Sequence, residues 1–218
     1  LYRPLKYNDL DIFIRNGKSL SVIEKITKSK DFKPFSELVS SLRPFGLRGY
    51  FTQDEKFRET ANGLKKPIKC YGKGKQIGYV EYNEIAKNKE WIERWKLFMP
   101  RANNIGTELP DDNLNSFVGE PRTICTESYL ALGANQNYSK NECENISLFL
   151  KTRFARFAHS VAKSSQDATA KTFRFVPFLD FSLPWTDEEL FKKYDLDDQE
   201  IAFINSMIRP MDVGGLDE

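Results

Sequence analysis

The sequence has little of the side-chain chemistry that most enzymes use. It contains one histidine, His159, and three cysteines that lie far apart, Cys70, Cys125 and Cys143. No CxxC pair is present, so a zinc site is not expected, and a Ser-His-Asp triad would have to use His159. An odd number of scattered cysteines disfavours a disulfide framework and suits a reducing compartment, so we expect a cytoplasmic protein.

The sequence also lacks the motifs that span a membrane, bind nucleotide phosphates or position a base for methyl transfer. No apolar run approaches the ~20 residues of a membrane span, and no signal peptide is recognised. No glycine-rich phosphate loop follows a predicted strand. No Asn-Pro-Pro-aromatic or Asp-Pro-Pro-aromatic tetrapeptide, the motif that positions an exocyclic amine for methyl transfer, occurs. We therefore expect no membrane partner and no catalytic, cofactor-binding or metal-binding residue in this chain.

The charge that is present is unevenly distributed. Residues 1–109 hold 22 Lys and Arg against 13 Asp and Glu, whereas residues 180–218 hold 3 against 11. A cationic front and an acidic tail indicate either a polyanionic partner for the front or packing of the two ends on each other.

Hydrophobic spacing predicts an α+β fold. We expect one mixed, twisted sheet, in which Gly-Lys-Gly-Lys closes a hairpin between the first two strands. Its strand segments are predicted near 68–82, 95–100, 122–134 and 172–178. Shorter helices are predicted over 19–29, 35–42 and 83–95.

One long helix is predicted over 139–163, and it should pack across the sheet. It begins with a capping box, Ser139 and Glu142, and its apolar side chains recur at helical spacing on one face. The opposite face carries Thr152, Arg156, His159 and Lys163. This face is interpreted either as a solvated basic back or as a surface for a phosphate backbone.

Two acidic helices are predicted over 186–196 and 197–208, where a capping residue and acidic first turn precede apolar positions. They should form a C-terminal helical hairpin. We therefore divide the chain into a domain over 1–182 and a hairpin over 183–218 that packs on it.

Three regions combine cationic side chains with short amide, carboxylate and hydroxyl groups, namely 43–49, 100–108 and 163–174. Such groups can bind base edges, and Lys and Arg can bind phosphates. Phosphate contacts are predicted for Arg43, Arg48, Arg101, Arg156, Lys163, Lys171 and Arg174. Base-edge contacts are predicted for Asn103, Asn104, Gln166, Asp167 and Thr169. The alternative is a set of ordinary polar loops above buried phenylalanines.

The sequence around these regions also resembles a known family. The resemblance is carried by "FSELVSSLRPFGLRG", "WKLFMPRANNIGTE", "GEPRTICTESYLALGA", "FLKTRFARFAHSVAKSSQDATAKTFRFVPFLDF" and "KKYDLDDQEIAFINSMIRPM". In this order, over most of residues 35–211, they resemble the C-terminal target-recognition region of adenine-specific DNA methylases of type II restriction-modification systems. That family includes bifunctional enzymes that both methylate and cut.

The resemblance implies that this chain recognises double-stranded DNA by sequence and is itself non-catalytic. An N-terminal methylase domain of a longer parent chain would be its partner. S-adenosylmethionine would be the cofactor of that parent protein and not of this chain.

Two other functions remain open. A metal-dependent restriction endonuclease domain of the Pro-Asp…Glu-x-Lys type would use Asp111 and Glu120, although Arg122 stands where that motif has Lys. A protein-interaction module of a restriction-modification complex would dock a partner subunit on the acidic helices at 186–208.

Overall fold

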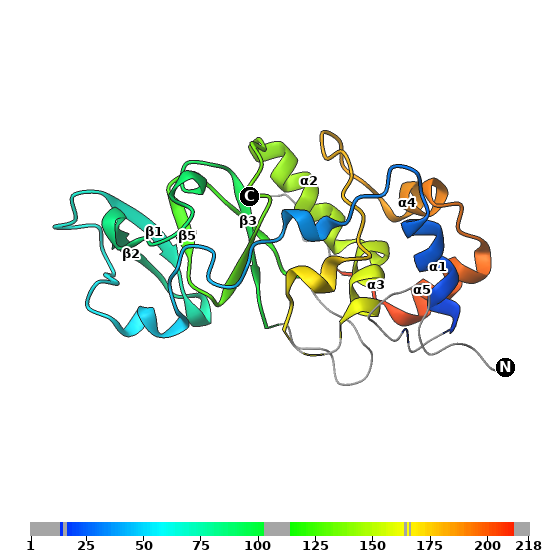
Figure 1. The fold of residues 1–218 in the computed structure, drawn as a ribbon, viewed down its shortest axis with the longest axis horizontal. Helices are drawn as coiled ribbons and strands as arrows, with labels where there is room; N and C mark the ends of the chain where they lie inside the picture. The colour runs from blue at the N-terminus through cyan, green and yellow to red at the C-terminus, as the bar shows by residue number, and fades with distance from the viewer. Residues whose placement is uncertain (1–13, 15–16, 103–113, 164, 166, 212–218) are drawn as a thin grey trace.

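The computed structural model describes residues 14, 17–102, 114–163, 165 and 167–211. These residues form five α-helices and two three-stranded sheets. The predicted α+β class is confirmed. The strands occupy one half of an elongated molecule and the helices occupy the other half (Figure 1).

The first sheet is mixed and has the order β2-β1-β5. β1 (Pro67–Tyr71) and β2 (Ile77–Glu81) are antiparallel, and the expected hairpin joins them through a 3-10 turn, η3 (Lys73–Lys75). β5 (Thr123–Cys125) runs parallel to β1.

The second sheet is antiparallel and has the order β4-β3-β6. It consists of β4 (Phe117–Gly119), β3 (Lys96–Pro100) and β6 (Tyr129–Leu132). One continuous sheet was therefore a wrong prediction. A turn closed by a hydrogen bond from the Tyr129 N–H to the Thr126 carbonyl (3.1 Å) redirects the chain between β5 and β6. The two strands then join different sheets.

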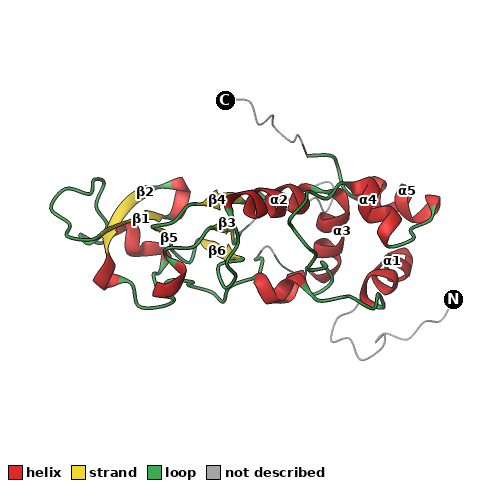
Figure 2. Cartoon of the chain, turned by 90° about the horizontal axis from the view of Figure 1, so that it is seen from above, coloured by secondary structure: helices red, strands yellow, loops and turns green. Residues whose placement is uncertain are grey.

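Side chains of β3 and β6 alternate between two hydrophobic cores. Leu97, Met99 and Leu130 enter a larger core shared with the helices, which we call the helical core. Phe98 and Ala131 enter a smaller core beneath the first sheet, which we call the strand core. Because strand side chains alternate with a period of two, the second sheet separates the two cores. Figure 2 shows this sheet between the first sheet and the helices.

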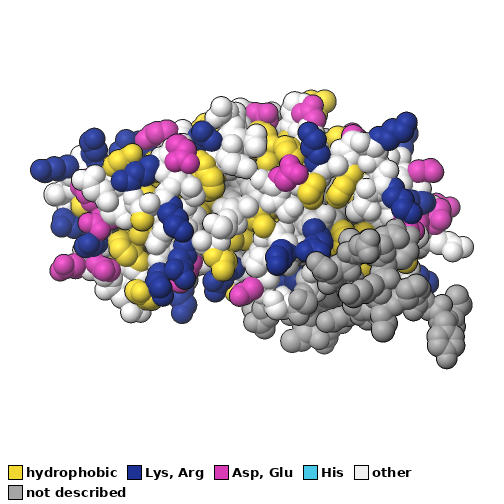
Figure 3. Space-filling model, in the orientation of Figure 1, with side chains coloured by type: hydrophobic (Ala, Val, Ile, Leu, Met, Phe, Trp, Pro, Cys, Tyr) yellow, Lys and Arg dark blue, Asp and Glu magenta, His cyan; other side chains and the backbone are white. Residues whose placement is uncertain are grey.

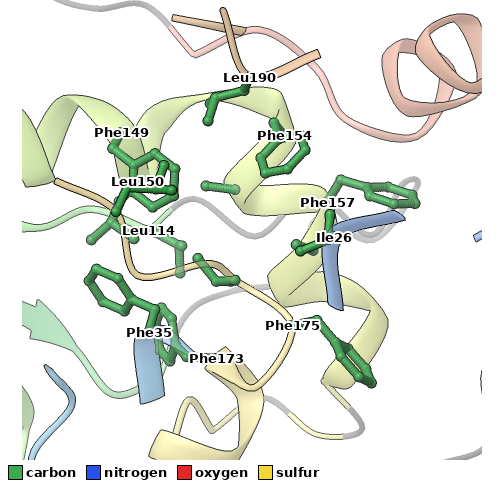
Figure 4. Close-up of a cluster of buried hydrophobic side chains, with 14 of the residues drawn as sticks. Ile26, Phe35, Leu114, Phe149, Leu150, Phe154, Phe157, Phe173, Phe175 and Leu190 are labelled. Carbon is green, nitrogen blue, oxygen red and sulfur yellow. The ribbon is translucent and has the colours of Figure 1, made fainter. Parts of the chain in front are cut away.

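Aromatic side chains dominate the helical core (Figure 4). Phe35 contacts Phe149, Phe173 and Phe181, with ring centroids 5.6–6.2 Å apart. These rings come from distant parts of the chain, so the core ties together η1 (Phe35–Leu38), the helices and the loop after η6 (Ala170–Phe173).

The C-terminal helices α4 (Asp187–Lys193) and α5 (Asp198–Met207) both begin with capping boxes, as their sequences indicate. They lie near α1 (Gly17–Thr27) at the end of the molecule remote from β1 and β2 (Figure 1). Lys25 Nζ pairs with Glu200 Oε2 at 2.7 Å, and Lys193 Nζ pairs with Asp31 Oδ2 at 2.9 Å. Lys25 of the cationic front thus pairs with the acidic tail, whereas in the second pair the tail supplies the cation and the front supplies the carboxylate.

Two helices replace the single helix expected over 139–163. α2 (Lys140–Lys151) carries the predicted capping box, and α3 (Arg153–Ala162) follows after Thr152. Thr152 Oγ1 accepts the Ala155 N–H at 3.1 Å and donates to the Phe149 carbonyl at 2.7 Å. Threonine is a favoured N-cap, so Thr152 starts a new helix even though the apolar spacing continues across it.

The face of α3 that was expected to be solvated is buried. Arg156 and His159 are both 0% exposed. Arg156 Nη1 donates to the Arg209 carbonyl at 2.7 Å, and His159 Nε2 shares a 2.8 Å hydrogen bond with Thr172 Oγ1. α3 contacts α4, α5 and η6, and Arg156 and His159 are shielded from solvent.

Several other elements differ from their sequence patterns. The helix expected over 83–95 is two 3-10 turns, η4 (Tyr82–Glu84) and η5 (Lys89–Trp91), because Asn88 between them is left-handed, with φ 50°. The helix expected over 35–42 is the 3-10 turn η1. The strand expected over 172–178 does not form, and these residues comprise the end of the 3-10 turn η6, a turn and an isolated bridge from Pro177 to Pro34. Conversely, β4 lies in a segment with turn composition and was not predicted.

No helix in the described ranges is long and apolar enough to cross a membrane. Cys70, Cys125 and Cys143 are buried free thiols.

A buried lysine joins the chain segments that precede β3 and β5. Lys96 is 0% exposed. Its Nζ donates hydrogen bonds to three carbonyl oxygens, at Ile92 (3.3 Å), Arg94 (2.7 Å) and Glu120 (3.2 Å). Burial lowers the pKa of Lys96 to about 8.

This pKa predicts a pH-dependent stability. Between about pH 8 and pH 10.5 the folded state has lost a proton that the unfolded chain still binds, so the free energy of unfolding rises with pH through this group. Relative to Lys96→Met, the wild type should gain roughly 1–2 kcal/mol between about pH 8 and pH 9.5. Urea unfolding of both proteins across this range measures the gain, and parallel pH curves would contradict it.

A second prediction concerns the junction of α3 and α4. Asp187 at the start of α4 accepts the N–H groups of Arg153 (3.1 Å) and Phe154 (2.9 Å), so it caps α3 from another helix. Asp187→Ala should lower the free energy of unfolding by about 1–2 kcal/mol. Urea denaturation measures this loss. The exposed neighbour Glu188 provides the control, since Glu188→Ala should change stability by less than about 0.5 kcal/mol.

Candidate nucleic-acid interface

The end of β3 brings two of the predicted loops together. Arg101, the first residue after β3, donates its N–H to the Ser128 carbonyl (3.0 Å) and accepts the Ala168 N–H (2.8 Å). Its Nε lies 3.7 Å from Asp167 Oδ1, and Ala102 forms an isolated antiparallel bridge with Asp167. A predicted phosphate-binding residue and a predicted base-reading residue thus lie side by side.

Glu127 joins the third predicted region, residues 43–49, to the end of β3 beside Arg101. Its Oε2 accepts a hydrogen bond from Arg43 Nε at 2.9 Å, and its Oε1 accepts the Gly49 N–H at 3.0 Å. The Gly49 hydrogen bond and then the ion pair with Arg43 lower the pKa of Glu127, although partial burial opposes them. The positive charge of Arg101 also lowers the pKa of Glu127.

These contacts join the three predicted regions, as far as the structure describes them, into one surface. We call it the cationic loop surface, and it comprises residues 43–50, 100–102, 127–128 and 167–174. On the face shown in Figure 3, Lys and Arg side chains gather over the strand end of the molecule and again beside η6, which is yellow in Figure 1.

The loop that carries Arg43 is shaped by its backbone. Arg43 has φ 57° and Gly46 has φ 86°, and the Gly46 N–H donates to the Arg43 carbonyl at 3.1 Å. Phe45 between them is buried in the strand core. A side chain at Gly46 would lie 2.9 Å from Ala86 Cβ, so glycine is needed there. A left-handed arginine is unfavourable, and the Glu127 contacts compensate for that cost.

The structure adds residues that the sequence patterns did not identify. Next to Arg48 is the 3-10 turn η2 (Gly49–Gln53), whose Tyr50 is 64% exposed. η2 contacts the η3 turn of the β1–β2 hairpin, which carries the exposed Lys73. Thr52 and Gly72 approach so closely that a Cβ at Gly72 would lie 2.2 Å from the Thr52 methyl carbon. The sequence showed this hairpin but not its position beside Arg48.

The remaining cations lie around η6. Lys171 is exposed, and Arg174 is half-buried with its Nε donating to the Lys171 carbonyl at 3.2 Å. Both line a hollow of about 560 Å³ together with Phe32. Lys163 ends α3 and is half-buried. Thr169 precedes η6, and its backbone N–H donates to Thr172 Oγ1 at 3.3 Å while its carbonyl accepts from the same hydroxyl at 2.8 Å.

Arg156 is the one clear correction to the predicted contact set. Its side chain is 0% exposed and bonded to the Arg209 carbonyl, and burial lowers its pKa to about 10. A phosphate on the surface cannot reach it in this structure. Asn103, Asn104 and Gln166 lie outside the described residues, so their predicted base contacts stay predictions.

The alternative sites are only partly within the described structure. Glu120 is exposed, with its Oε1 3.6 Å from Lys69 Nζ, whereas Asp111 lies outside the described residues. Within the described ranges no group of three or more His, Cys, Asp or Glu is arranged to hold a metal ion. The docking of a partner on α4 and α5 stays a prediction.

Similarity to known proteins is found among solved structures. No protein-family model matches the chain, and no curated protein matches it. Among solved structures, the type IIG restriction endonuclease BpuSI aligns with a TM-score of 0.39 at 10% sequence identity, covering 88% of this chain and 28% of that chain. This chain thus spans less than a third of that protein.

Glu127 provides a test of the cationic loop surface. Glu127→Ala should lower the free energy of unfolding at pH 7 by about 1–2 kcal/mol, because the Gly49 N–H and Arg43 lose their acceptor. Since the folded pKa is lowered, this loss should shrink as the pH falls through that pKa. Urea unfolding at about pH 7 and pH 4 measures both effects.

Glu93→Ala is a matched control. Glu93 Oε1 lies 3.8 Å from Arg122 Nη1, and both side chains are more than half exposed. Its removal should change stability by less than about 0.5 kcal/mol. Equal losses in the two variants would show that Glu127 does not organise the loops.

Proposed function

We propose that this chain is a sequence-specific double-stranded DNA recognition domain of a restriction-modification N6-adenine DNA methyltransferase, whose catalytic half lies outside this chain. The loop surface would bind the duplex and present an adenine to that half. The family resemblance of the sequence supports the recognition function. The sequence also lacks a methyl-transfer motif, which supports placing the catalytic half outside this chain.

The observation that carries the proposal is the joining of the three loops. Arg101 and Asp167 pair across two of them, and Glu127 holds Arg43 and Gly49 of the third. Regions separated by more than 50 residues in sequence therefore offer cations and hydrogen-bonding groups together. Duplex recognition requires this combination, because phosphate contacts set the register and base-edge contacts supply specificity.

The proposed division of labour follows from side-chain type. Six of the predicted phosphate ligands have exposed or half-buried side chains, and they are Arg43, Arg48, Arg101, Lys163, Lys171 and Arg174. Asp167 would accept a hydrogen bond from cytosine N4, and Thr169 would contact a base edge. An adenine rotated out of the duplex would then enter the catalytic pocket of the methylase domain.

The salt dependence of binding tests this function. Six phosphate contacts predict that the logarithm of the association constant falls with the logarithm of salt concentration with a slope of about −5. Fluorescence anisotropy of a labelled random-sequence duplex of about 25 base pairs measures the slope. Selection from a randomised duplex library should enrich one sequence. A shallow slope without enrichment would contradict the proposal.

Substitution of single lysines distinguishes a defined interface from a general effect of charge. Lys171→Ala should weaken binding to all duplexes alike and reduce the magnitude of the slope by about 0.9, since one phosphate contact is lost. Lys192→Ala removes an equally charged, exposed side chain from α4 and should leave the slope unchanged. Equal effects of both substitutions would indicate a general charge effect and not a defined interface.

A further inference from the structure

Tyr50 is an exposed aromatic residue within the cationic loop surface. In the described part of the chain it is one of four large hydrophobic residues that are clearly exposed, at 64%. Its neighbour Phe51 packs against the strand core, so the two rings of η2 separate, one inward and one outward. The Tyr50 ring, unlike that of Phe51, is not packed in the strand core, so it is available to contact a ligand.

The turn that carries Tyr50 is held in place from several sides. The Gly49 N–H donates to Glu127, and the Phe51 N–H donates to the Arg48 carbonyl at 3.1 Å. The Asp54 N–H donates to the Phe51 carbonyl, also at 3.1 Å. The backbone at Tyr50 is thus fixed before any partner binds, and a preorganised contact group loses less entropy on binding.

A cation lies beside the ring. The Arg48 guanidinium carbon is 5.9 Å from the centre of the Tyr50 ring. An exposed aromatic ring next to an arginine on a surface that binds nucleic acid is the arrangement that stacks a base while the cation meets the adjacent phosphate. Enzymes that rotate a base out of a duplex also hold that base by stacking it on aromatic or apolar side chains.

We propose that Tyr50 is a stacking residue for an unpaired base of the bound duplex, with Arg48 contacting the adjacent phosphate. This inference rests on the proposed function, because the duplex must first bind to the same surface. The stacking role predicts that Tyr50 makes the chain bind more tightly to DNA in which one base is already unstacked.

Paired and bulged duplexes test the role of Tyr50. The probes are a 25-base-pair duplex of fixed sequence and the same duplex with one extra, unpaired 2-aminopurine. The wild-type chain should bind the bulged duplex about 5- to 100-fold more tightly, the range expected for one stacked base. Tyr50→Ala should lose this preference, whereas Tyr50→Phe should keep most of it.

Two controls distinguish the possible failures. Ile77→Ala removes another exposed apolar side chain, 52% exposed on β2, and should keep the preference for the bulge. Tyr50→Ala should keep the wild-type melting temperature and salt slope, since the ring is exposed and uncharged, whereas Arg48→Ala should reduce the magnitude of the slope by about 0.9.

The outcomes separate the inference from the function on which it rests. A wild-type chain that binds duplexes with a steep salt slope but shows no preference for the bulge overturns the stacking role alone. The same holds if Tyr50→Ala retains the preference. A wild-type chain that binds neither duplex overturns both.

Discussion

The alternation of side chains along β3 and β6 is the constraint on which the rest of the structure depends. These two strands are buried on both faces, with leucines toward the helices and Phe98 and Ala131 toward the first sheet. The central sheet therefore cannot shift by one residue without exchanging the contents of both cores. Because Arg101 directly follows β3 and Glu127 lies between β5 and β6, the same register fixes the position of both residues.

The two carboxylates within the cationic loop surface have a physical role. Glu127 holds Arg43, and Asp167 lies near Arg101, so the guanidinium groups have defined positions and do not simply repel one another. Ion pairs that are partly exposed contribute only about 0–1 kcal/mol. Under the proposed function, such pairs are weak enough for a phosphate to replace the carboxylate. A purely cationic surface would attract DNA more strongly but would place its charges less accurately.

Local patterns predicted the β1–β2 hairpin, β3, α1, α2 and the capped helices α4 and α5, because each depends on turn residues, caps or apolar spacing within a short segment. The break at Thr152 was missed since the apolar spacing continues through it, and the burial of Arg156 was missed since it depends on which segments cover α3. The proximity of the three loops was a hypothesis from residue types. The carboxylate at Glu127 that joins them acts through contacts 78 and 84 residues away, which no local pattern reveals.

Because Asp187 caps α3, the chain cannot be divided cleanly between residues 182 and 183. The boundary suggested by composition falls between residues 182 and 183, yet the first helix beyond it completes the N-terminus of a helix before it. Recombination at that boundary would separate a cap from its helix and the Arg156 side chain from the carbonyl it binds. If this chain is exchanged between proteins as a unit, that unit must carry both acidic helices with it.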